Sequence, residues 1–246
     1  MRKRNVEFTI YLTLSILAGL MVLIFQSFRW SYGHLVYNTT DHAWDAQIKS
    51  AELTCSIINF IFASLTFIHK SRRRLKDKDN FLYLVLLFMF LSDLFFLVAD
   101  FNNTIIRDVN EVLGGYICFL IAYAIIVVFL KPRFYEIIIR VVLAAALPFV
   151  YYLIFKKFDA MKIVELEVIV EVIINAVFSF IKYKKEQSRF SFYIFISMVL
   201  AFTFLTFAAL RTITNGSMTI SNLFAIFVWP LYIAELAVLN HLYRKY

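Results

Sequence analysis

Residues 81–100 read FLYLVLLFMFLSDLFFLVAD, a stretch in which side chains charged at neutral pH occur only at Asp93 and Asp100. A helix of about 20 apolar residues spans the hydrocarbon core of a bilayer, because each residue advances the helix by about 1.5 Å. We therefore expect this stretch to form a transmembrane helix that carries one acid, Asp93, well inside its length.

The same pattern of long apolar runs separated by short polar loops recurs along the whole chain. It predicts an all-α integral membrane protein, a single domain over residues 1–246 in which about eight transmembrane helices form a bundle. The first run is too long for the apolar region of a signal peptide, and no A-x-A cleavage site follows it, so we expect it to be retained. The expected spans are 7–28, 51–69, 81–100, 112–130, 134–155, 163–181, 190–210 and 218–241.

The composition excludes several classes of protein. Hydrophobic residues make up 62% of the chain, against about 45–50% in ordinary globular domains. With 5 glycines and 3 prolines, the chain has too few turn residues for a soluble all-β or α/β protein. Cys55 and Cys118 lie inside apolar runs and are expected as small buried residues. No cysteine or histidine pattern suggests a metal site or disulfide framework, and no metal or cofactor is expected.

The positive charge follows the membrane pattern. The net charge is +8, but lysines and arginines cluster at the ends of the apolar runs, which indicates topology and argues against nucleic-acid binding. With both termini in the cytoplasm, the inner segments carry more than twice as many lysines and arginines as the outer ones, which favours this orientation. Membrane lipid is the expected partner and the bacterial inner membrane the expected location. A protein partner or homo-oligomer stays open.

Ionisable residues inside the spans are the first candidates for a functional site, because a charge at mid-membrane costs about 2.5–3.5 kcal/mol on insertion scales. They are Asp93, Arg140, Glu167, Glu171 and Glu235. The helical rise places Asp93 about 10 Å and Glu171 about 12 Å below the outer edge. These two acids are therefore expected at one level, with Glu167 one turn from Glu171, in an acidic cleft open to the outside.

Two readings of these acids stay open. A carboxyl group removed from water tends to keep its proton at neutral pH, as general acid–base catalysis or proton carriage requires. Alternatively, the acids bond neighbouring hydroxyl groups and hold the helices together.

Arg140 predicts a second pair at the inner side. Arg140 and Glu235 both lie about 9 Å from the cytoplasmic edge, and Glu136 lies one helical turn before Arg140. A structural ion pair between Arg140 and Glu235 is favoured. The alternative is a site for lipid phosphate made by Arg140 with Lys131 and Arg133.

Short motifs in three spans carry a resemblance to a known family. The third span contains Phe90-Leu-Ser-Asp-Leu-Phe-Phe96, and the eighth contains Tyr232-Ile-Ala-Glu235. The fourth span adds a smaller set, Gly115, Phe119, Ala122 and Tyr123. With the eight short-looped spans, these motifs resemble the YhhN/TMEM86 family of lysoplasmalogenases, which hydrolyse the vinyl-ether bond of lysoplasmalogen lipids.

The resemblance implies roles for particular residues. Asp93 stands where the family has an acid, Tyr123 stands where a histidine is usual, and Glu235 replaces a usual glutamine. The second family acid, in the seventh span, is missing, because residues 201–207 read AFTFLTF. The resemblance thus implies Asp93 as the acid, Tyr123 as a hydroxyl donor, and Glu171 or Glu235 as the second carboxyl.

Three functions follow from the sequence. The first is a lysoplasmalogenase-like hydrolase of ether lipids. The second is a non-catalytic membrane scaffold of the same fold that binds lipid or a protein partner. The third is a proton-coupled carrier, which would use Asp93 and the acids of the sixth span.

Overall fold

The computed structural model describes residues 2–35, 45–72, 77–101, 109–213 and 218–246. These residues form helices almost throughout, and none of them lies in a β-strand. The helices are α1 (Arg2–Leu35), α2 (Asp45–Ser71), α3 (Asp77–Phe101), α4 (Val109–Leu130), α5 (Phe134–Phe155), α6 (Ala160–Glu186), α7 (Arg189–Ile213) and α8 (Met218–Lys245). The expected all-helical class is confirmed.

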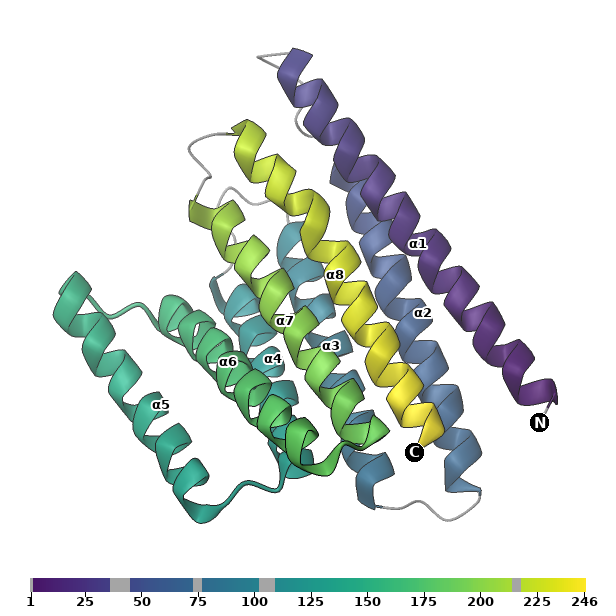
Figure 1. The fold of residues 1–246 in the computed structure, drawn as a ribbon. Helices are drawn as coiled ribbons and strands as arrows, with labels where there is room; N and C mark the ends of the chain where they lie inside the picture. Colours follow the sequence, from purple (N-terminus) through teal and green to yellow (C-terminus); the bar gives the residue numbers. More distant parts are fainter. Residues whose placement is uncertain (1, 36–44, 73–76, 102–108, 214–217) are drawn as a thin grey trace.

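Successive helices run antiparallel, as the short connections predicted (Figure 1). The starts of α1, α3, α5 and α7 and the ends of α2, α4, α6 and α8 share one end of the bundle, which also holds both chain termini (Figure 1). We refer to it as the terminal end.

Seven helices form a closed series of neighbours, and α5 stands outside it (Figure 1). In this series α1 contacts α2, and contacts continue through α3, α4, α6, α7 and α8 back to α1. The last helix, α8, also contacts α2 and α3. Side chains on several sides of α8 therefore lie inside the bundle. Among the described residues, α5 contacts only α6.

Seven helices have the length and apolar character needed to cross a membrane, namely α1 to α5, α7 and α8. The sixth expected span is also a helix, α6, with 27 residues. It is long enough to cross a membrane but carries more charge than the other seven. Acids and lysines recur along α6, so it lacks the long, nearly uncharged stretch that each of the other seven helices has. The structure thus supports an integral membrane protein with several spans.

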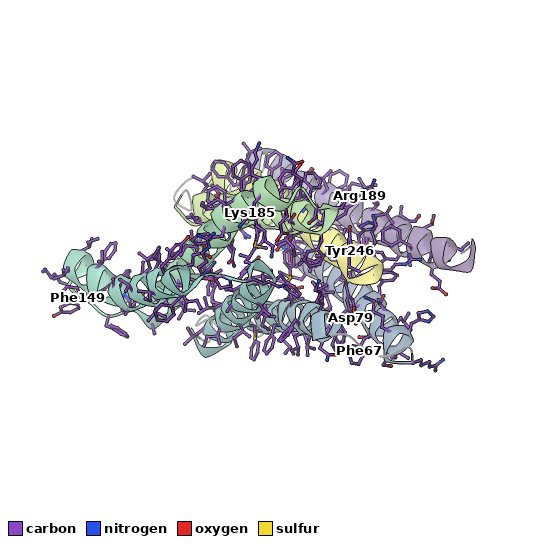
Figure 2. The ribbon with its side chains drawn as sticks, turned by 60° about the horizontal axis from the view of Figure 1, so that its bottom comes forward. Phe67, Asp79, Phe149, Lys185, Arg189 and Tyr246 are labelled. Carbon is purple, nitrogen blue, oxygen red and sulfur yellow. The ribbon has the colours of Figure 1, made fainter. Side chains whose placement is uncertain are left out.

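Large apolar side chains cover the outside of the bundle. On α5, Phe149 and Ile154 are 64% and 66% exposed, and on α1 Ile16 is 53% exposed. Figure 2 shows Phe149 on the outlying α5. Such side chains suit a hydrocarbon surrounding, whereas a soluble protein rarely exposes large continuous apolar surfaces.

Glycines allow α3 and α4 to approach closely. A Cβ atom added at Gly115 would lie 2.8 Å from Cζ of Phe96, and one added at Gly114 would lie 2.9 Å from Cδ1 of Phe95. Small residues permit such close approach between membrane helices. This contact brings the interior face of α4, which includes Tyr123, toward Asp93 on α3.

Candidate active site

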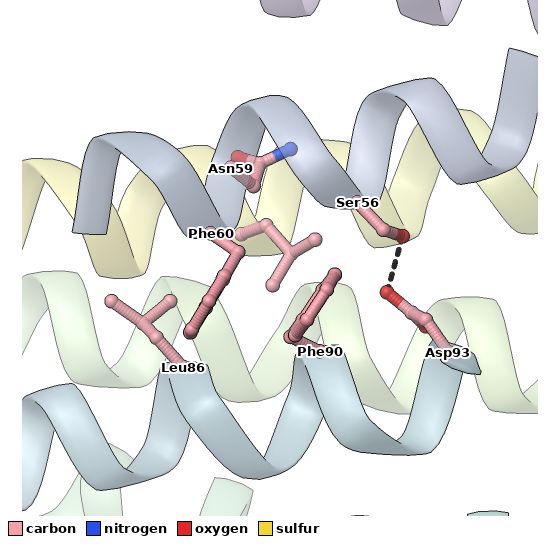
Figure 3. Close-up of a pocket in the computed structure, with 7 residues that line it drawn as sticks. Ser56, Asn59, Phe60, Leu86, Phe90 and Asp93 are labelled. Atoms are coloured by element: carbon pink, nitrogen blue, oxygen red, sulfur yellow. Dashed lines mark hydrogen bonds between the residues drawn. The ribbon is translucent and has the colours of Figure 1, made fainter. Parts of the chain in front are cut away.

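Asp93 lies in the interior between α3 and α2. Its side chain is 3% exposed, and the hydroxyl of Ser56 on α2 donates to its Oδ2 atom at 2.5 Å (Figure 3). The preceding residue, Ser92, donates its hydroxyl to the carbonyl of Gly115 at 2.8 Å. Asp93 therefore points at a polar partner on a neighbouring helix and away from the bilayer.

Glu235 lies fully buried on α8. The hydroxyl of Tyr123 on α4 donates to its Oε2 atom at 3.3 Å. The backbone carbonyl of Tyr123 in turn accepts a hydrogen bond of 3.0 Å from the side-chain amide of Asn175 on α6. The other carboxyl oxygen, Oε1, has no hydrogen-bond partner in the described part of the chain.

Tyr232 links the two acids. It lies about one helical turn before Glu235, and its hydroxyl donates to the carbonyl of Met89 at 3.4 Å. Electrostatic interactions connect the phenol group of Tyr232 with the carboxyls of Asp93 and Glu235, and these two carboxyls with each other. We call this group the acid cluster, which comprises Ser56, Asp93, Tyr123, Tyr232 and Glu235.

The interior beside Asp93 is closely packed. A cavity of about 10 Å³ lies there, close to the minimum that holds one water molecule. The rings of Phe60 and Phe90 stack beside it with centroids 4.2 Å apart (Figure 3). The cavity is lined by Ser56, Asn59, Phe60, Leu86, Phe90, Asp93 and Leu236. It suits a water held against a carboxyl and a hydroxyl, and it is too small for a lipid.

Three of the four residues expected to be catalytic lie together. Asp93, Tyr123 and Glu235 belong to the acid cluster, although they come from α3, α4 and α8. Glu171 does not join them. The acidic cleft expected between Asp93 and Glu171 is absent from the described residues because α6 packs on α4, α5 and α7 and makes no contact with α3.

The predicted ion pair between Arg140 and Glu235 is wrong. Arg140 on α5 forms its ion pair with Glu171 on α6, because α6 is the helix that α5 contacts in the described part of the chain. The guanidinium carbon of Arg140 also lies 5.6 Å from the centre of the Phe178 ring. Its Nε and Nη2 atoms have no hydrogen-bond partner among the described residues. Glu171 therefore links α6 to α5 through its ion pair with Arg140.

The other residues named with Arg140 lie at the start of α5. The side chain of Glu136 accepts a hydrogen bond of 3.1 Å from the backbone N–H of Arg133 and caps the helix. Lys131 precedes this cap, in the short link between α4 and α5. Glu167 is partly buried on α6, one turn before Glu171.

Several buried hydrogen bonds between helices involve residues that the sequence did not single out, namely Tyr11, Gln26, Glu52 and Asn240. Gln26 on α1 donates to Glu52 on α2 at 3.4 Å. Asn59 on α2 accepts hydrogen bonds from Tyr11 on α1 at 2.6 Å and from Asn240 on α8 at 3.3 Å. These bonds tie α1, α2 and α8 together next to the acid cluster. Their signal in the sequence is an amide in an otherwise apolar run, a pattern typical of interhelical hydrogen bonds.

A larger hollow lies between α1 and α2, outside the acid cluster. It has a volume of about 360 Å³ and is lined by Ala18, Met21, Phe25, Gln47, Ser50, Ala51 and Thr54. None of these residues belongs to the acid cluster.

No protein-family model, curated protein or solved structure matches this chain. The assignment of chemistry therefore rests on the site itself. The acid cluster offers two carboxyls, two phenol groups and one serine hydroxyl in an interior largely closed to water. Such a set can donate a proton, accept one back and orient a water molecule.

Proposed function

We propose that the chain is a lysoplasmalogenase-like membrane hydrolase that cleaves the vinyl-ether bond of a lysoplasmalogen-type lipid. The observation that supports this proposal most is the meeting of Asp93, Tyr123 and Glu235 in one buried cluster. These are residues that the family resemblance singles out, and they come from three different helices. Glu235 supplies the second carboxyl in this proposal, in place of the acid missing from the seventh span.

The proposed reaction needs a proton donor and a water. Asp93, held by Ser56, gives its proton to the carbon of the vinyl group that lies farther from the ether oxygen. The oxygen-bearing carbon becomes a cation, which the carboxylates stabilise. Water adds to that carbon, and Glu235 takes the proton that the water releases. As the hemiacetal breaks its bond to the glycerol oxygen, Asp93 takes the hydroxyl proton and Glu235 returns its proton to the departing oxygen. The products are a long-chain aldehyde and a water-soluble glycerophosphodiester, and both carboxyls return to their starting states.

Substrate access requires movement of the helices. The cavity beside Asp93, about 10 Å³ in volume, has room for one water and not for a lipid chain, so the helices around the acid cluster must separate during turnover. We place this site in the bacterial inner membrane, with both termini in the cytoplasm, as the charge distribution favours.

The direct test is aldehyde release from a lysoplasmalogen by the purified protein in nanodiscs. Asp93→Asn removes the proton donor, so the rate is expected to fall by about 10²–10⁴-fold, the usual contribution of general acid catalysis. Glu186→Gln is the matched control, since it also converts a carboxyl to an amide but on a side chain that is 45% exposed. Wild-type protein without turnover, or equal rates in Asp93→Asn and wild type, would refute the proposal.

The close packing beside Asp93 favours a second candidate, a non-catalytic scaffold of the same fold that binds lipid or a protein partner. In that case the acid cluster serves only to hold α2, α3, α4 and α8 together. The scaffold predicts no aldehyde release, a lower melting temperature for Asp93→Asn, and lipid or a partner protein that copurifies with the wild type.

A further inference from the structure

Three lysines from separate segments gather at the terminal end of the bundle, away from the acid cluster. Lys78 Nζ, at the start of α3, lies 5.3 Å from the centre of the Phe190 ring. The ring of Phe190 packs against that of Phe129 with centroids 5.9 Å apart. Lys182 of α6 donates to the backbone carbonyl of Phe129, and Lys131 follows Phe129 by two residues. We call Lys78, Lys131 and Lys182 the lysine triad.

The lysine triad lies where the apolar spans end. The span of α3 begins at Lys78, and the span of α4 ends at Leu130, one residue before Lys131. The span of α7 begins at Arg189, next to Phe190. Figure 2 shows this end, with Lys185 and Arg189 marking the turn from α6 to α7. A position at the end of several spans is the level of the lipid headgroups.

Positive charge at the lysine triad exceeds the negative charge around it. Among the described residues, the carboxylate within ion-pair distance of the triad is Glu186, which lies 3.7 Å from Lys182 Nζ and is 45% exposed. The nearby acid Asp79 is engaged by Lys70. Lys78 and Lys131 both lie close enough to Lys182 for their charges to repel it. The Lys182 side chain is nevertheless only 15% exposed, so the fold holds its cation in place against that repulsion.

We propose that the lysine triad binds the phosphate group of an anionic membrane lipid. Basic pockets between transmembrane helices are known to hold phosphate-bearing headgroups, and lysine ammonium groups bind phosphate oxygens as point charges. The sequence left open, as the alternative to a structural ion pair, a phosphate site made by Arg140 with Lys131 and Arg133. Because Arg140 is bound to Glu171, the proposed site keeps Lys131 and gains Lys78 and Lys182. This site is independent of the proposed hydrolysis.

The test compares the binding of spin-labelled phosphatidylglycerol and phosphatidylcholine to the full chain in nanodiscs. The wild type is expected to hold phosphatidylglycerol preferentially, with each lysine contributing about a fivefold preference. The triple variant Lys78→Gln, Lys131→Gln and Lys182→Gln is expected to lose this preference. A triple change of the same lysines to arginine is expected to keep it.

The matched control removes the same charge from the opposite end of the bundle, through Lys156→Gln, Lys157→Gln and Lys162→Gln. It is expected to leave the preference intact. Equal losses in the two glutamine triples, or a wild type that does not distinguish the two lipids, would overturn the proposal. Displacement of phosphatidylglycerol by millimolar inorganic phosphate would overturn the assignment to a lipid. If the triple glutamine variant of the lysine triad does not fold, the single variants Lys78→Gln and Lys131→Gln test the proposal instead. Each is expected to lower the preference for phosphatidylglycerol about fivefold.

Discussion

Ser56 is the closest polar neighbour of Asp93, and its hydroxyl donates to the carboxyl at 2.5 Å. A hydrogen bond to a neutral carboxyl group contributes about 0.5–1.5 kcal/mol. Its role in the proposed reaction is to orient Asp93 toward the substrate.

Ser56→Ala is expected to lower the rate constant of aldehyde release by about tenfold, because a loss of about 1.4 kcal/mol corresponds to a factor of ten. The measurement is a full kinetic curve, in which kcat falls and KM stays constant. Ser56→Thr keeps the hydroxyl and restores the rate. Ser64→Ala, on the same helix but bonded to Tyr83, is the control. A rate that is unaffected in Ser56→Ala would show that Ser56 does not position the acid.

At this scale the sequence predicts the acids and misses their partners. Asp93 and Glu235 stand out because a carboxyl inside an apolar run is costly. Serines such as Ser56 do not stand out, since single serines also bond within their own helix. Their roles depend on which neighbouring helix they face. The sequence gives the position of a residue along its own helix, but not which helix lies beside it.

The ion pair between Arg140 and Glu171 is the clearest polar link between α5 and the rest of the bundle. The two side chains are 10% and 14% exposed, and α5 has no other helix to pack on among the described residues. Removing one partner of a buried pair leaves an uncompensated charge and costs about 3–5 kcal/mol.

A charge swap tests this link. Arg140→Glu and Glu171→Arg are each expected to lower the melting temperature of the purified protein, and the double swap is expected to recover most of the loss. The control double variant, Arg140→Glu with Glu235→Arg, is expected to show no recovery. Recovery in that control but not with Glu171 would contradict the structure and favour the pairing that the sequence predicted.

The wrong partner for Arg140 shows what helix arithmetic leaves out. The rise per residue predicted similar heights for Arg140 and Glu235 on their own helices. However, α5 lies outside the closed series of helices and α8 lies within it. The order of helices around a bundle depends on side-chain packing between distant segments, so equal height does not make two residues neighbours.

The molecule as a whole is an antiparallel bundle whose termini share one end (Figure 1). The number of helices and their approximate bounds were predictable, because each apolar run has the length of a membrane crossing. The role of α6 was less predictable, since its charges keep it outside the set of seven apolar spans.

Single cysteines test whether α6 crosses the membrane. In a chain without Cys55 and Cys118, a cysteine at Ser188 lies in the turn that follows α6, and a cysteine at Lys157 lies in the turn that precedes it. A membrane-impermeant maleimide is expected to label Lys157→Cys in intact cells and Ser188→Cys only in inverted vesicles. Labelling of both from the same side would mean that α6 does not cross.

The central claim is that Asp93 acts together with Glu235, and that Glu171 only holds α5. The most direct measurement compares aldehyde release by Glu235→Gln and Glu171→Gln, each normalised to the folded, monodisperse fraction. We expect Glu235→Gln to be as impaired as Asp93→Asn and Glu171→Gln to keep the wild-type rate per folded molecule. An active Glu235→Gln variant beside an inactive Glu171→Gln variant would contradict this account.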